Sequence, residues 1–71
     1  MAKGFDETIA ALGQANDRLY RLEEVDYPTA AYKGFSAQGD TLAEVQDAIR
    51  ETQATIRQLE ERLDALNDQL D

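Results

Sequence analysis

The sequence contains no cysteine and no histidine. Without cysteine, the chain can form no disulfide and offers neither a thiolate metal ligand nor a cysteine nucleophile. Without histidine, it lacks the usual general base near neutral pH and a common ligand of zinc and other transition metals. We therefore expect a protein that is not an enzyme and that binds no metal and no cofactor.

Carboxylates are plentiful, but their spacing matches no known type of site. Neighbours such as Glu23 and Glu24 point in different directions on a helix, and no di-metal Glu-x-x-His arrangement occurs. Asp64 and Asp68 share a helix face, yet the twelve-residue calcium loop of an EF-hand is missing. The sequence predicts no catalytic site and no metal site.

Long apolar runs and clusters of basic residues are also missing. No stretch approaches the ~20 apolar residues that a membrane-spanning helix requires, and the first residues lack the apolar segment of a secretory signal. The 71 residues carry a formal net charge of -8, which repels the phosphates of nucleic acids and of anionic lipids. We expect no nucleic-acid partner and no membrane partner, and a location in the cytoplasm or in a particle assembled there, such as a virion.

Residues 6–25 are predicted to form an amphipathic helix. Asp6 is the expected N-cap, and Gly13 inside the helix costs about 1 kcal/mol relative to alanine. Pro28 disfavours the helical backbone at the residue before it, so this helix should end at or before Tyr27. Apolar and small residues recur at spacings of three and four, as one helix face requires. They are Phe5, Thr8, Leu12, Ala15, Leu19 and Leu22, with Ile9 and Ala11 beside them.

Residues 26–40 break the helical period and are predicted to form an irregular linker. Three of the five aromatic residues lie here, namely Tyr27, Tyr32 and Phe35, whereas the connection between antiparallel helices is normally short and polar. One interpretation is that these side chains fold back to close the end of a helix bundle. The other is that they form a docking surface for a partner, because aromatic side chains supply large contact area at a small entropy cost.

Residues 41–70 are predicted to form one long helix, which begins at a capping box made by Thr41 and Glu44. Its apolar residues alternate at spacings of three and four, which is the repeat of a coiled coil. The helix should be roughly 45 Å long, against roughly 28 Å for the first, so the first cannot cover it. The predicted oligomer seam comprises Leu42, Val45, Ile49, Thr52, Ile56, Leu59, Leu63, Leu66 and Leu70.

The predicted fold class is all-α, with a single domain over residues 1–71. Two architectures satisfy the pattern. In the first, the chain is a helical hairpin whose copies associate into a four- or six-helix bundle. In the second, the long helices form a parallel coiled coil and the rest of the chain makes a head, which the length of the linker favours. The seam mixes residues that favour two strands with residues that favour three, so we expect a homo-oligomer, either dimer or trimer.

These features predict a non-enzymatic structural or assembly subunit. Such a protein would self-associate through its coiled coil and join, decorate or scaffold a larger protein assembly, with the virion of a bacterial virus as one setting. The alternative is an acidic regulatory or inhibitor protein that mimics the charge of nucleic acid and binds a basic surface of its partner. The charge of -8 on a small helical body motivates this alternative.

Overall fold

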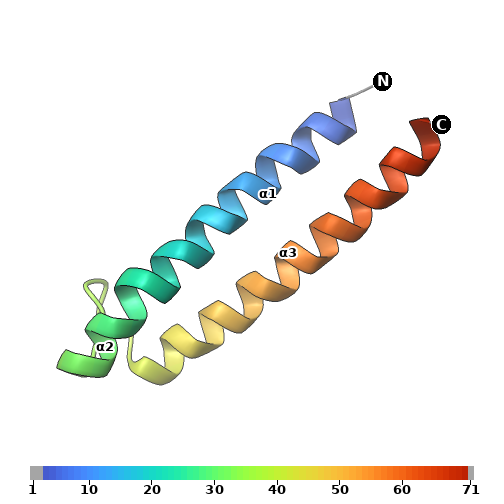
Figure 1. Ribbon diagram of the computed structural model, residues 1–71. Helices are drawn as coiled ribbons and strands as arrows, with labels where there is room; N and C mark the ends of the chain where they lie inside the picture. The colour runs from blue at the N-terminus through green and yellow to red at the C-terminus, as the bar shows by residue number, and fades with distance from the viewer. Residues whose placement is uncertain (1–2, 71) are drawn as a thin grey trace.

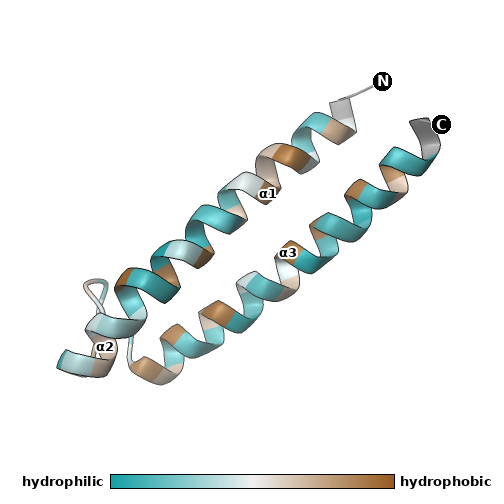
Figure 2. Cartoon of the chain, in the orientation of Figure 1, coloured by the Kyte–Doolittle hydropathy of each residue, from teal (hydrophilic) through white to brown (hydrophobic). Residues whose placement is uncertain are grey.

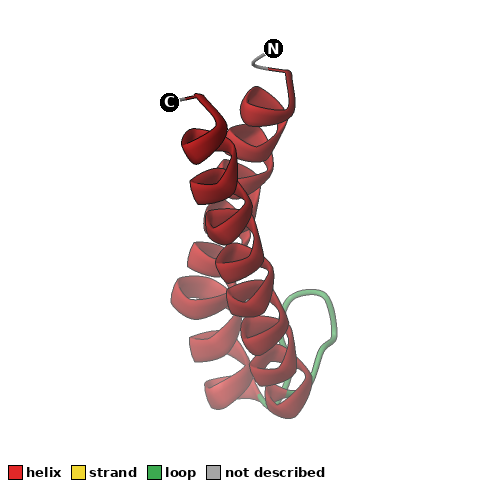
Figure 3. Cartoon of the chain, turned by 90° about the vertical axis from the view of Figure 1, so that its right-hand side faces the viewer, coloured by secondary structure: helices red, strands yellow, loops and turns green. Residues whose placement is uncertain are grey.

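The computed structural model describes residues 3–70, and these form an antiparallel hairpin of two long helical arms (Figure 1). The first arm comprises α1 (Lys3–Arg21), the π-helical turn η1 (Leu22–Asp26) and α2 (Tyr27–Lys33). The second arm is α3 (Leu42–Leu70). The molecule measures 50 × 15 × 14 Å, and two views at right angles show the arms side by side (Figure 3). The all-α fold is confirmed, and of the two predicted architectures the single chain adopts the hairpin.

The first arm continues through Pro28, so the expected end at or before Tyr27 is wrong. Tyr27 has helical backbone angles (φ -62°, ψ -52°), and its N–H donates to the carbonyl oxygen of Leu22, five residues back. In a regular α-helix the proline ring would clash with the carbonyl of Glu24, to which it also cannot donate a hydrogen bond. The wider π turn immediately before Pro28 accommodates the ring at the start of α2.

This continuation makes the two arms similar in length, which corrects the expectation that the first helix is too short to cover the second. The ends of the arms lie beside each other at Lys3 and Leu70, which we call the open end of the hairpin (Figure 1). The other end, which contains α2 and residues 34–41, is the closed end. Asp6 is in the first turn of α1 and is not its N-cap, because the helix already begins at Lys3.

The connection between the arms spans residues 34–41 and is shorter than the predicted linker. Gly34 ends α2 in the left-handed conformation (φ 92°), and its N–H donates to the carbonyl oxygen of Ala30 at 2.8 Å. Ser36 is 1% exposed and organises the loop: its N–H donates to the carbonyl oxygen of Asp40 at 2.7 Å, and its Oγ accepts the Asp40 N–H at 3.2 Å. The loop is therefore hydrogen-bonded to itself rather than an irregular tether.

The predicted capping box at the start of α3 is confirmed. The Thr41 N–H donates to Oε1 of Glu44 at 2.8 Å, and the Glu44 N–H donates to Oγ1 of Thr41 at 3.2 Å. Two N–H groups that have no partner within the helix are satisfied in this way. The cap fixes where α3 begins.

The best-buried apolar cluster lies near the closed end. Leu22, Ala30 and Val45 form its centre, and Leu42, Ala48 and Ile49 pack around it partly buried. Apolar positions nevertheless recur along both arms up to the open end (Figure 2). The core is thus complete only at one end of the hairpin.

Candidate protein interface

The predicted seam of α3 faces the first arm, but its residues are buried unequally. Side chains spaced seven residues apart lie on the same side of a helix, and they separate into two rows along each arm. We call the buried set the inner row: Thr8, Ala15, Leu22, Val45 and Thr52. Leu59 and Leu66 continue it half-buried toward the open end. The side chain of Leu70 lies outside the described set.

The second row, which we call the outer row, consists of large apolar side chains that are all half-buried. Because the arms are antiparallel, the outer rows of the two arms lie on the same side of the hairpin and form one apolar surface along its length. The outer row comprises Phe5, Leu12, Leu19, Leu42, Ile49, Ile56 and Leu63.

In the middle of the hairpin the inner row is small and partly polar. The hydroxyl groups of Thr8 and Thr52 donate to the carbonyl oxygens of Gly4 and Ala48, each at 2.7 Å, so neither buried hydroxyl lacks a partner. Ala15 and Thr52 line one hollow between the arms. At these levels the buried residues are therefore small, while Leu22 and Val45 fill the inner row near the closed end.

The side of the hairpin opposite the outer row carries shallow hollows with charged linings. One is lined by Arg18, Glu51 and Thr55, and another, nearer the open end, by Glu7 and Arg62 among others. Ala11 and Arg18 are seven residues apart, as are Thr55 and Arg62, so these positions follow one side of each helix. This side, which we call the polar side, carries charged residues, whereas the outer row is apolar.

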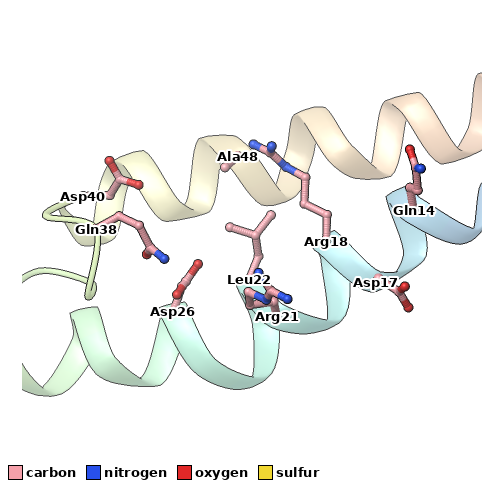
Figure 4. A pocket seen from close by; sticks show the side chains of 9 residues that line it. All are labelled: Gln14, Asp17, Arg18, Arg21, Leu22, Asp26, Gln38, Asp40 and Ala48. Carbon is pink, nitrogen blue, oxygen red and sulfur yellow. The ribbon is translucent and has the colours of Figure 1, made fainter. Parts of the chain in front are cut away.

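A third hollow lies on the polar side near the closed end and has a volume of about 430 Å³. Arg18 extends toward α3 beside Ala48, while Asp26 and Gln38 project into the same space (Figure 4). Among the side chains of residues 4–68 the only ion pair is Arg50–Asp47, on the exposed surface of α3, so none of the charged residues around this hollow forms one, although Asp26 is only 7% exposed. The hollow is an open depression with both signs of charge.

The three candidate docking residues lie at the closed end and remain exposed in the single chain. Tyr32 is 89% exposed, Phe35 55% and Tyr27 38%. They do not fold back to cover the end of the hairpin core, which Ala30 and Ser36 fill instead. In the single chain the aromatic segment therefore does not close the end of the hairpin, and its exposed side chains are available to dock a partner.

Further exposed apolar side chains were not predicted as site residues. Ile9 is 45% exposed beside the outer row, although its place next to the apolar stripe predicts burial. Tyr20 and Val25 are 67% and 49% exposed on the first arm. In the sequence, Tyr20 and Val25 lie outside the repeating apolar stripe. That position indicates exposure, because an apolar residue off the buried face of a helix must face water or a partner.

The part of the chain that the structure describes contains no group of three or more acidic, cysteine or histidine side chains placed to hold a metal ion. Nor does either arm, over residues 3–70, have a segment long and apolar enough to cross a membrane. Comparisons with protein families, with curated proteins and with solved structures find no match to this chain.

Proposed function

We propose that this protein is a structural or assembly subunit that self-associates and joins, decorates or scaffolds a larger complex. Its role in this proposal is mechanical and non-catalytic: the helical surface binds copies of the chain, and the closed end binds the rest of the assembly. A virion is one setting in which such a small subunit would serve.

The observation that carries the proposal is the incomplete burial of the outer row. A leucine or isoleucine gains roughly 1.5–3 kcal/mol when it moves from water to a packed interior. In the single hairpin part of this gain is unrealised for the outer row, while several of the buried positions hold small residues, namely Thr8, Ala15 and Thr52. A chain of this size rarely forms a sufficient core alone, and oligomerisation is a common remedy. A partner that covers the outer row supplies the missing burial.

The exposed aromatic residues of the closed end extend the proposal to a larger partner. Tyr27, Tyr32 and Phe35 lie on α2 and the loop, away from the outer row of the two long helices. Tyrosine and phenylalanine are enriched at protein interfaces because they bury large areas with few rotatable bonds. A subunit that self-associates along its arms keeps this end available to bind another protein.

The mass of the isolated protein in solution tests this proposal. We expect light scattering at micromolar concentration to give a mass at least twice the 7.9 kDa of one chain. A monomer at all accessible concentrations, with full helix content by circular dichroism, would overturn it.

A further inference from the structure

We infer that a second copy of this chain covers the outer row, and that the two hairpins pack face to face as a four-helix bundle. This inference rests on the self-association proposed above and specifies its surface and its geometry.

The chemistry of the two sides favours the outer row as the surface between copies. Two chains that each carry a net charge of -8 associate best through a surface that brings few charges together. On the polar side, association would bury residues that include Glu7, Arg18, Glu51 and Arg62. The positions that border the outer row are mostly uncharged, namely Ile9, Asn16, Gln46, Gln53 and Asn67, and Glu23 and Glu60 are the charged exceptions.

The hairpin exposes more area than a compact monomer of its mass, and the excess matches the area that one partner of the same size would cover. The chain exposes 5255 Å². A compact monomer of 7.9 kDa exposes about 4,400 Å². The excess of about 850 Å² is close to the area of roughly 800 Å² that each partner contributes to an interface of standard size. Two hairpins can bury this excess by covering each other's outer rows, since four-helix bundles are built from two such layers.

Paired substitutions test the surface. Ile56→Lys places a charge in the outer row, whereas Thr55→Lys places the same charge one residue away on the polar side. We expect Ile56→Lys to raise the dissociation constant at least tenfold and Thr55→Lys to leave it within about threefold. Because Ile56 is partly buried within the single hairpin, Ile9→Lys is the second variant: Ile9 is already exposed there, and we expect the same weakening with unchanged helix content.

The outcomes separate the two proposals. A wild-type monomer overturns the proposed function and this inference together. An oligomer that survives both Ile56→Lys and Ile9→Lys overturns the assigned surface but leaves self-association standing. A dimer that both variants weaken and that Thr55→Lys leaves intact supports the inference in full.

Discussion

Thr41 and Glu44 exchange hydrogen bonds at the start of α3, each backbone N–H donating to the other residue's side chain. Both residues are exposed, so they contribute to stability through the hydrogen bonds to two backbone N–H groups and not through burial of their side chains. The first turn of α3 also carries Leu42 and Val45, which belong to the best-buried cluster. A change at this cap therefore acts on the part of the hairpin that is packed best.

Replacing the capping threonine should weaken the fold measurably. We expect Thr41→Ala to lower the free energy of unfolding by about 1 kcal/mol, measured by urea denaturation at one fixed protein concentration. Thr55→Ala, an exposed position in the middle of the same helix, is the control and should change it by less than about 0.5 kcal/mol. Equal losses in the two variants would mean that the cap makes no special contribution.

Two glycines should respond to alanine with opposite signs. Gly34 has a φ of 92°, where an alanine Cβ is strained, so Gly34→Ala should destabilise the protein by about 1–2 kcal/mol. Gly13 lies inside α1 with open space around an added Cβ, so Gly13→Ala should stabilise it by about 1 kcal/mol. Thermal denaturation of both variants checks the pair. A stabilising Gly34→Ala would contradict the left-handed end of α2.

Burial predicts which large side chains matter for folding. Leu22 is 7% exposed, and we expect Leu22→Ala to cost about 2–5 kcal/mol. Tyr32 is larger but 89% exposed, so Tyr32→Ala should alter the stability by less than about 0.5 kcal/mol. Denaturant titration followed by circular dichroism measures both. A large loss in Tyr32→Ala would show that the closed end packs against the core, contrary to the structure.

Salt distinguishes the proposed assembly subunit from the acidic inhibitor. The outer row is apolar, and the copies share a charge of -8, so screening should leave self-association unchanged or strengthen it. We expect the mass measured by light scattering to stay constant or rise between low and high sodium chloride. An inhibitor that binds a basic surface would instead lose its partner as salt rises. Dissociation of the homo-oligomer by salt would point to ion pairs between copies and against the outer row.

Local rules predict much of the second arm. The capping box at Thr41 and the unbroken apolar repeat place α3 correctly, because both depend on residues within a few turns of each other. The prediction for the first arm is wrong at Pro28. There the preference of Tyr27, the residue before proline, for a non-helical backbone indicates a helix end. The π turn at Leu22–Asp26 avoids the clash by adding a residue to the turn, and no local preference in the sequence indicates that solution.

The candidate interface was less predictable than the fold. The heptad pattern predicts the same burial for Val45 and Ile49, since both belong to the predicted seam. Which of them is buried depends on the arm that lies opposite, where Leu22 and Ala30 enclose Val45 and leave Ile49 only partly buried. Burial along a seam is a property of two helices at once, so the sequence of one helix cannot specify it.

The side-by-side position of Lys3 and Leu70 determines how the hairpin responds to a pulling force. A load applied across the open end separates the arms one layer after another, instead of shearing all the contacts at once. The first layers to part are the half-buried ones around Phe5 and Leu63, and the last is the cluster of Leu22 and Val45. The molecule should therefore open like a zipper, at low force and with many small steps, and refold from its closed end.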